Sequence, residues 1–470
     1  MGWPYGCAAG GLDTTALDDA APVLAKSQKI GGFDMAVAGR KAPNVSEIVN
    51  MDWYSTLSGR GVHAFWASFL GWALDAFDFM VFSFGLSAIA ATFALTQGQS
   101  GLIATVTLLV SASGGMLAGT LADSIGRVRT LMVTVGVYSV FTFLSGMSQS
   151  YGQLLLFRSL QGLGFGGEWA AGAVLIAEMS DPAQRGRVIG FMQSAWAIGW
   201  GLAAIAFVIV FSMAGPAMGW RILFWLGILP ALLILYIRSK VPEPAVFEET
   251  HREKVQRTGR ALETGATSNS LIQIFRRDLL PTTIAASVLA TGAQGGYYAI
   301  FTWLPTYLKT ARKLAVVGTG EYLLVVILGA FLGYVITGYV VDWLGRRTTF
   351  AIMSVISGVV LIAYTQIPPG DNGLLLVLGF PLGFFASGIF SGFGSYLAEL
   401  FPSRARGAGQ GFAYNFGRAA GALFPTAVGF LSGVVGFGGA IAFGAAGYAL
   451  ALVALAFLPE TTGKEFEAVD

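Results

Sequence analysis

The sequence predicts an all-α polytopic membrane protein with twelve transmembrane helices in two pseudo-symmetric six-helix bundles. The first observation is composition: 55% of the 470 residues are hydrophobic and 11% are charged, whereas soluble domains carry about 25% charged residues. The second is a series of apolar runs of about 20 residues, the length that spans a bilayer as a helix. The third is a charged loop sequence that occurs twice, which indicates a duplicated chain.

The apolar runs fall into two sets of six, separated by a polar stretch. The first set predicts helices at 65–93, 101–122, 128–148, 151–175, 187–212 and 220–238, and the second at 282–308, 319–341, 347–366, 372–396, 408–433 and 438–458. The expected organisation is a disordered tail at 1–60, a bundle at 61–240, a linker at 241–280, a second bundle at 281–460 and a short tail at 461–470. Parallel halves of this kind place a solute between them, near the membrane midplane.

Charged positions at the predicted helix ends recur from one half to the other. The set that recurs 219 residues later is Gly119, Asp123, Gly126 and Arg127, followed by Gly338, Asp342, Gly345 and Arg346. The set that recurs 221 residues later is Glu178 and Arg185, followed by Glu399 and Arg406. Each loop copy offers a tight turn between an acid at one helix end and cations that begin the next helix. We expect acid–cation pairs at these ends to hold one face of each half closed.

The distribution of Lys and Arg predicts the orientation. Of the 28 such residues, two fall inside predicted helices, four lie on one side of the membrane, and 22 share the other side with both termini. Because loops rich in Lys and Arg stay in the cytoplasm, we expect both termini there, in a bacterial inner membrane. The first fifty residues carry no signal-peptide pattern, so they either form a tail or precede a true translation start at Met51.

Composition also argues against several classes of protein. The net charge of +2 gives no reason to expect a nucleic acid partner. The single cysteine, Cys7, excludes an intrachain disulfide, and the two histidines, His63 and His251, lie far apart in the sequence. No nucleophile–histidine pairing or phosphate-binding loop is present. We therefore expect no enzyme, no cofactor and no metal, but a monomer in the lipid bilayer.

Three acidic residues fall inside predicted membrane helices. Asp75 and Asp78 lie three residues apart, on one face of the helix at 65–93, and Glu168 lies in the helix at 151–175. A charged side chain at the bilayer centre costs about 2.5–3.5 kcal/mol, and burial and a like-charged neighbour both favour the neutral acid. These three residues are our candidates for proton coupling. The alternative is a structural role in which they bond neighbouring helices and never titrate.

Arginine and aromatic side chains provide candidate contacts for a solute. Arg418, about ten residues into a helix, is the best candidate anchor for an anion, because guanidinium binds carboxylate in a bidentate manner. The alternative for Arg418 is an ion pair with an aspartate of the helix at 65–93. Arg158 either contacts solute or pairs with another helix, with Glu168 among its candidate partners. Further candidates, which are equally suited to plain helix packing, are Gln193, Trp196, Gln294, Tyr297, Tyr298, Trp303 and Asn415.

The repeated loop carries a family resemblance. The pattern G-x-L-A-D-x-x-G-R-x-R-T at 119–130 resembles the loop between the second and third helices of the major facilitator superfamily. The pattern R-x-x-Q-G-x-G-x-G-G at 158–167 resembles that family's helix-four motif, which is associated with proton-coupled members. The resemblance implies alternating access by two rocking halves. It also implies that the repeated positions at the helix ends form cytoplasmic gating networks.

A closer resemblance lies in L-D-A-F-D-F at 74–79 and G-x-G-F-G-G-E-W-A-A-G at 162–172. These patterns look like the sialate:proton symporters and their monocarboxylate relatives, with the aromatic-acid:proton symporters next. They imply proton-coupled uptake of a small organic acid anion such as a monocarboxylate, sialate or an aromatic acid. The alternatives are a carrier of a neutral or zwitterionic solute, an efflux antiporter, or a transporter-like solute receptor.

Overall fold

The computed structural model describes residues 29–30, 33–34, 52–55, 57–179, 185–241, 270–402 and 405–462. Most of the predicted tails and linker, including Met51, lies outside these ranges. The chain divides into two units, residues 1–42 and 43–470. In the first, strands β1 (Lys29–Ile30) and β2 (Phe33–Asp34) form an antiparallel pair. The second unit is helical and contains the candidate site.

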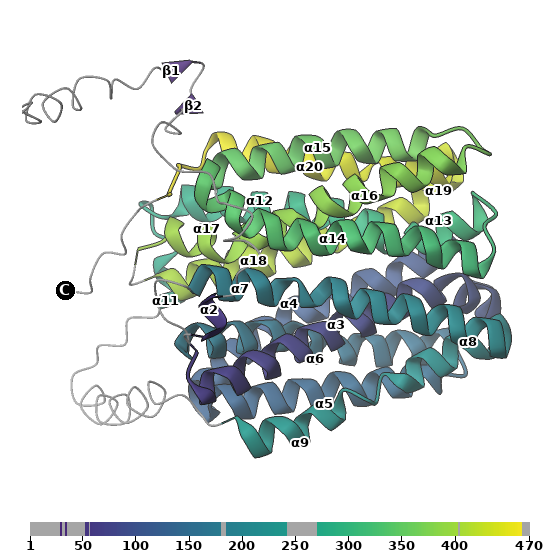
Figure 1. Cartoon of the computed structure of the whole chain (residues 1–470), viewed down its shortest axis with the longest axis horizontal. Coiled ribbons are helices and arrows are strands. Elements are labelled where there is room, and N and C mark those ends of the chain that lie inside the picture. Colours follow the sequence, from purple (N-terminus) through teal and green to yellow (C-terminus); the bar gives the residue numbers. More distant parts are fainter. Residues whose placement is uncertain are drawn as a thin grey trace, which may run out of the picture. The chain divides into compact units, whose positions relative to one another are not determined.

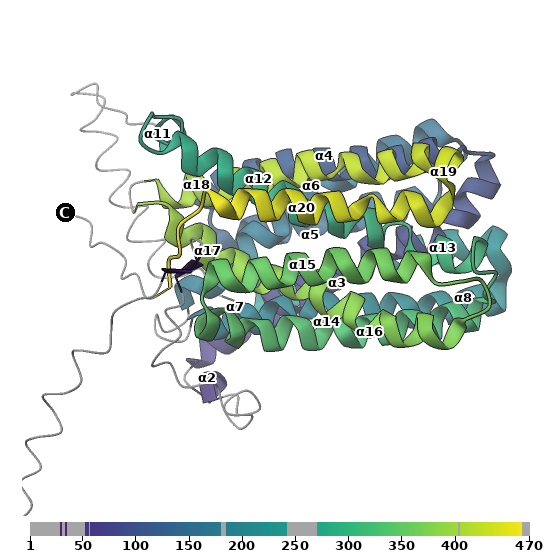
Figure 2. The same ribbon diagram turned by 90° about the horizontal axis from the view of Figure 1, so that it is seen from above.

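The helical unit consists of two halves that lie side by side with nearly parallel helices (Figures 1 and 2). The helices of the first half are α2 (Asp52–Ser55), α3 (Gly59–Phe93), α4 (Gln97–Ile125), α5 (Arg127–Gly146), α6 (Tyr151–Met179), α7 (Arg185–Gln193), α8 (Ala195–Leu226) and α9 (Ala231–Lys240). Those of the second half are α11 (Ser270–Gln273), α12 (Leu280–Phe301), α13 (Leu304–Thr310), α14 (Val316–Leu344), α15 (Arg346–Gln366), α16 (Asn372–Gly388), η2 (Ile389–Gly392), α17 (Phe393–Leu400), α18 (Arg406–Gly421), α19 (Leu423–Ala442) and α20 (Gly444–Ala456).

Two glycines divide continuous helical stretches into separate membrane crossings. Gly215 lies inside α8 and Gly436 inside α19, with φ of 67° and 75°, a left-handed conformation that favours glycine. A straight helix of the 53 residues from Val188 to Lys240 would be about 80 Å long, far more than a hydrocarbon core of about 30 Å. By length and composition alone, eight helices of the described residues are able to cross a membrane. With each stretch divided at its glycine, and with α6 and α12 added, the crossings number twelve.

The two halves repeat the same backbone devices. Gly215 and Gly436 are 221 residues apart, the spacing of the repeated helix-end charges. Gly126 and Gly345 both break the chain with ψ of 157° and positive φ, between α4 and α5 and between α14 and α15. We call the end of the bundle that holds these two turns the motif end, and the opposite end the distal end. The duplication predicted from the sequence is therefore visible in the backbone.

Close glycine contacts set the packing within each half. A Cβ added at Gly166 of α6 would lie 1.7 Å from the carbonyl oxygen of Ser111 on α4. In the second half, a Cβ at Gly383 of α16 would lie 1.8 Å from the carbonyl oxygen of Val326 on α14. Small residues permit such backbone approach where lipid provides no hydrophobic drive between helices. The glycine at 166 therefore allows α4 and α6 to pass closely.

The halves meet along α4 with α18 and α19, and along α8 with α14. Near the distal end, the Thr105 hydroxyl of α4 donates to the carbonyl of Ala422 and lies 2.7 Å from the Thr426 hydroxyl. Near the motif end, Gly190 of α7 lies against Gly338 of α14: a Cβ on Gly190 would be 3.9 Å from the Gly338 Cα. The halves are therefore in contact on both sides of the midplane.

One short helix was not expected from the sequence. Residues 52–55 fall in the predicted tail, but they form α2, and α3 already begins at Gly59. The reason is Trp53, which is 2% exposed and packs its ring 5.2 Å from Phe65 of α3 and 5.3 Å from Phe191 of α7. Aromatic burial of this kind orders a segment whose own helix propensity is negligible at four residues.

The turn at Gly436 provides a test of the helical hairpin. We expect Gly436→Ala to lower the free energy of unfolding by about 1–3 kcal/mol, because alanine is strained at positive φ. The matched control is Gly433→Ala in the same helix, since an added Cβ at either position meets no atom within 4 Å. Thermal unfolding in detergent measures the effect. Equal melting temperatures for the two variants would show that the left-handed turn does not constrain the fold.

Candidate functional site

A narrow cavity lies between the two halves. Its volume is about 30 Å³, which is enough for roughly two water molecules. Its lining residues come from seven helices and η2 and are mostly aromatic: Trp72, Phe165, Gln193, Trp196, Tyr297, Tyr298, Tyr334, Phe390, Tyr414 and Arg418. The structure therefore brings five of the candidate solute contacts to one place: Gln193, Trp196, Tyr297, Tyr298 and Arg418.

Arg418 is the one arginine of the cavity lining. It is 2% exposed, and its guanidinium lies 5.5 Å from the ring centre of Phe165 and 5.3 Å from that of Tyr414. Its Nε and Nη1 atoms have no hydrogen-bond partner within the described part of the chain. It forms no ion pair with Asp75 or Asp78, so the alternative interhelix salt bridge is absent from this structure. The cavity thus contains a guanidinium with two unpartnered nitrogens and no ion pair, although Asp75 is near enough to interact with its charge.

A hydrogen bond crosses the cavity from one half to the other. The indole nitrogen of Trp196, on α8, donates to the hydroxyl of Tyr297, on α12, at 2.7 Å. The Trp196 ring also packs against Trp72, with ring centres 4.8 Å apart. These contacts close the space that a solute must occupy, so binding requires the two halves to move apart or the aromatic side chains to turn.

Gln294 and Asn415 lie beside the cavity rather than in its lining. The Gln294 amide donates to the carbonyl of Tyr414 at 2.9 Å and accepts from the Tyr298 hydroxyl at 3.2 Å. Asn415 donates to the carbonyl of Gly411 at 3.0 Å and packs against Gly115 of α4. Gln294 therefore positions a lining tyrosine, and Asn415 contacts the opposite half.

Asp78 and Arg158 form a buried ion pair inside the first half. The Arg158 Nη1 lies 3.4 Å from an Asp78 carboxylate oxygen, and the two side chains are 1% and 0% exposed. The Gln161 amide donates to the same oxygen. Rings of Phe82 and Phe224 lie 4.9 and 5.6 Å from the guanidinium. Arg158 therefore pairs with a neighbouring helix in this structure, and the acid that it pairs with is Asp78 rather than Glu168.

Glu168 lies against α3, next to Asp75. A Cβ added at Gly71, one turn before Asp75, would be 2.1 Å from a Glu168 carboxyl oxygen. The Asp75 and Glu168 carboxyls are within hydrogen-bonding reach of each other, and both are fully buried. Neither Asp75 oxygen has a donor partner among the described side chains. Two buried carboxyls in contact form a hydrogen bond only when one of them holds a proton.

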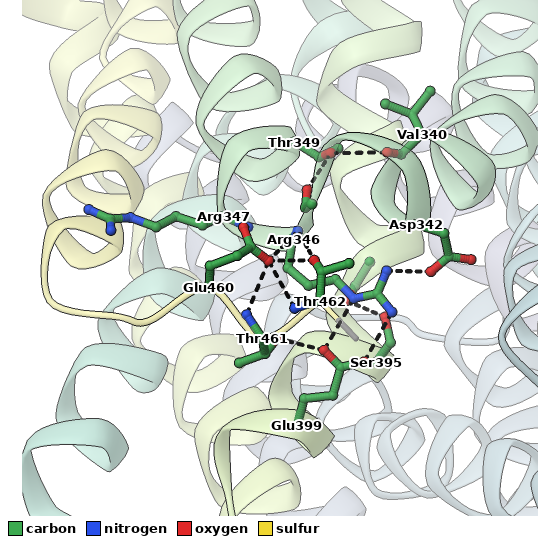
Figure 3. Close-up of polar contacts among 12 residues, drawn as sticks. Val340, Asp342, Arg346, Arg347, Thr349, Ser395, Glu399, Glu460, Thr461 and Thr462 are labelled. Carbon is green, nitrogen blue, oxygen red and sulfur yellow. Dashed lines mark hydrogen bonds and ion pairs between the residues drawn. The ribbon is translucent and has the colours of Figure 1, made fainter. Parts of the chain in front are cut away.

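A charged network closes the motif end of the second half (Figure 3). The Arg346 guanidinium binds Glu399 through two bonds, from Nε at 3.2 Å and from Nη2 at 3.0 Å. Its Nη1 pairs with Asp342 one turn earlier. Arg406 donates from Nε to the carbonyl of Ala398 at 3.1 Å. The structure therefore brings together three of the four charged positions predicted here, and Arg406 bonds the backbone beside them.

Glu460 is a member of this network that sequence reasoning missed. Helix α15 has Gly345 at its N-cap, so no side chain there accepts from the first backbone N–H groups. Glu460 replaces it, accepting from the amides of Arg346 at 2.8 Å and Arg347 at 2.9 Å (Figure 3). The signal was present as Pro459-Glu460, which repeats Pro242-Glu243, but the repeat alone indicated no partner.

Hydrogen bonds also change the ionisation of Glu460. Burial alone would raise the pKa of this carboxyl, but bonds from Thr462 and from the amides of Arg346, Thr462 and Arg347 outweigh it and lower the pKa. The carboxylate therefore links the segment after α20 to the start of α15, and it does so in its ionised form.

The corresponding network of the first half lies mostly outside the described side chains. This applies to Gly119, Asp123, Glu178 and Arg185. Gly126 is described and makes the same turn as Gly345, and the hydroxyl of Thr130 bonds its carbonyl at 2.7 Å, as Thr349 bonds Gly345 at 2.7 Å. The gating role of Gly338, which packs near Gly190, and of the other repeated positions stays a prediction.

Comparison with known proteins identifies a family. The model of the family "Sugar (and other) transporter" matches residues 30–470. A probable 4-methylmuconolactone transporter of Cupriavidus pinatubonensis is 40% identical over 418 residues, 89% of this chain and 95% of the relative. A cis,cis-muconate transport protein of Acinetobacter baylyi is 30% identical, with 84% and 94% covered. A crystal structure of a D-xylose–proton symporter shares the fold, with a TM-score of 0.66, 20% identity, and coverage of 86% of this chain and 99% of that chain.

The chain is therefore a major facilitator transporter, and it belongs to the sugar (and other) transporter family. The predicted fold of twelve helices in two bundles is confirmed, and so is the assignment as a transporter rather than an enzyme. The protein is a multi-pass membrane protein that carries a small solute.

Glu460 provides a test of the motif-end network. We expect Glu460→Ala to lower the free energy of unfolding by about 1–2 kcal/mol at neutral pH, because the Arg347 amide loses its acceptor and the Arg346 amide keeps only the Thr462 hydroxyl. Since the folded-state pKa is lowered, this contribution is complete above the ordinary value of 4.5 and is lost as the pH falls below it. The control is Glu321→Ala, an exposed position in α14. Thermal unfolding across pH measures both, and a difference that persists unchanged in acid would contradict the ionised cap.

Proposed function

We propose that this transporter takes up a small organic acid anion, such as a monocarboxylate, sialate or an aromatic acid, together with a proton. Transport proceeds by alternating access, with both termini in the cytoplasm. The observation that carries the proposal is Arg418: a buried guanidinium with unpartnered nitrogens, facing a cavity between the halves and lacking an acid partner there. A buried charge without compensation is costly, and a carboxylate is the ligand that suits a guanidinium best.

The aromatic walls of the cavity support an acid with a flat or apolar body. Eight of its ten lining residues are aromatic, and such rings bind flat apolar groups over large areas. The relatives named as carriers of 4-methylmuconolactone and cis,cis-muconate agree with this chemistry. A neutral sugar would leave the Arg418 guanidinium without a counter-charge.

Asp75 and Glu168 support coupling to a proton. Two buried carboxyls in contact are a stable arrangement when one of them holds a proton, and Arg418 lies close enough to interact electrostatically with Asp75. Arrival of a carboxylate at Arg418 changes the charge balance around Asp75, so the solute and the proton influence each other's binding. Asp78 is the less suited of the three candidates, because Arg158 already stabilises its ionised form.

The motif-end network supports gating at the cytoplasmic side. Asp342, Arg346 and Glu399 join α14, α15 and α17 of the second half. We expect this half to move as one body on opening, with contacts between the halves, such as Gly190 against Gly338, separating first.

Proteoliposome uptake tests the anion site. Lactate, pyruvate, sialate, benzoate and cis,cis-muconate are offered under an inward proton gradient. We expect one of these acids to enter the vesicles, and Arg418→Lys to raise its KM at least tenfold, because lysine retains the charge but not the bidentate geometry. The control is Arg312→Lys, whose Nη1 bonds the Ile367 carbonyl at 2.8 Å away from the cavity. Accumulation of a neutral sugar with no response to Arg418→Lys would overturn the proposal.

Proton coupling has a separate test in Asp75→Asn and Glu168→Gln. We expect both variants to lose accumulation driven by a proton gradient while retaining exchange of labelled for unlabelled acid, since exchange moves no net proton. Asp78→Asn is a poor probe, because it leaves Arg158 buried and unpaired. The control is Asp371→Asn, which keeps the N-cap of α16. Substrate-induced thermal stabilisation without proton movement in the wild-type protein would indicate a uniporter, an antiporter or a receptor.

A further inference from the structure

Three cations near the distal end differ in what they bind. Arg221 donates to the carbonyls of Gly146 and Ser148 at 2.8 and 2.7 Å, within the first half. Arg312 donates to a carbonyl of its own half, the second. The third cation, Lys309 of α13, donates to the Ser87 hydroxyl of α3 at 3.3 Å, so its bond joins the two halves. Lys309 is therefore in the interface that must open during transport.

The surroundings of Lys309 leave its charge unbalanced. The ammonium group has three donor hydrogens and, among the described residues, one long bond to a neutral hydroxyl. The ring of Phe211, on α8 of the first half, lies 5.7 Å away. None of the ion pairs between described residues includes Lys309. The half-buried ammonium faces a hydroxyl and an aromatic ring, so it still has donor hydrogens that an anion could accept.

We propose that Lys309 is a carboxylate-binding site at the distal mouth of the transport path, which receives the acid before it reaches Arg418. This site rests on the proposed function, since it assumes an anionic solute. When the halves separate at the distal end, the Ser87 hydroxyl leaves the ammonium and a carboxylate takes its place. When they close, Ser87 returns and Lys309 releases the acid inward. The same side chain then both attracts the solute and bonds the closed halves.

Charge is the property that separates this role from a merely structural one. Lys309→Gln retains a donor of similar reach for Ser87 but removes the positive charge. Lys313→Gln removes the same charge from an exposed position four residues later. Among the described residues, the Lys313 side chain forms no hydrogen bond or ion pair to the first half. The two variants change the net charge of the distal end equally, so only a local site distinguishes them.

The experiment measures initial uptake of radiolabelled benzoate and cis,cis-muconate into proteoliposomes at several salt concentrations. We expect Lys309→Gln to raise KM about tenfold at low salt with kcat changed less than twofold, and the difference to shrink at high salt, where charges are screened. We expect Lys313→Gln to change KM less than twofold. Melting temperatures of both variants check that folding is unaffected.

Other results would overturn the site. Equal KM for Lys309→Gln and the wild type, or an equal rise for both variants, would show that no local anion site exists at Lys309. If Lys309→Gln lowers kcat without changing KM, and salt does not alter the effect, Lys309 only holds the two halves together and does not bind the acid. If the wild-type protein takes up neither these two acids nor lactate, pyruvate or sialate, the proposed function fails and the site fails with it. Uptake by the wild type with an unaltered variant overturns the site alone.

Discussion

The cost of placing charge inside a hydrocarbon layer is the constraint on which the rest of this structure depends. The buried charged residues meet this cost in different ways. Asp78 and Arg158 neutralise each other, with Gln161 and two aromatic rings around them. Asp75 and Glu168 lie next to each other, so each is better buried as a neutral acid than as a carboxylate. Arg418, which faces the cavity, forms no ion pair within the described residues.

The same constraint explains how the halves are built and closed. Because lipid offers no hydrophobic drive for helix association, backbone approach at Gly166 and Gly383 provides the packing within each half. Charges outside the hydrocarbon then connect helix ends, as Glu460 and Arg346 do at the motif end. Between the halves, the described residues form bonds between neutral groups, such as that of Trp196 to Tyr297 and that of Thr105 to Ala422. Such bonds can break without leaving a charge unpaired, which suits a rocking motion of the two halves.

Much of the architecture followed from the sequence. Apolar runs located the helices to within a few residues, and the repeated Gly–Asp–Gly–Arg spacing identified the two loops that the backbone repeats at Gly126 and Gly345. That Gln193, Tyr297 and Arg418 line one cavity could not be predicted from the sequence. It depends on how far each helix is rotated about its axis, and an apolar run surrounded by lipid and protein carries little periodicity to show this.

By itself, the sequence determined the helix count, the duplication and the set of buried charges, because length, hydrophobicity and repetition are local properties of the chain. Only the tertiary structure decided which charges are neighbours. It paired Arg158 with Asp78, placed Glu168 beside Asp75, left Arg418 without an acid, and brought Glu460 to the start of α15 from 114 residues away. Such partnerships depend on helix crossings between distant segments, and sequence spacing does not record them.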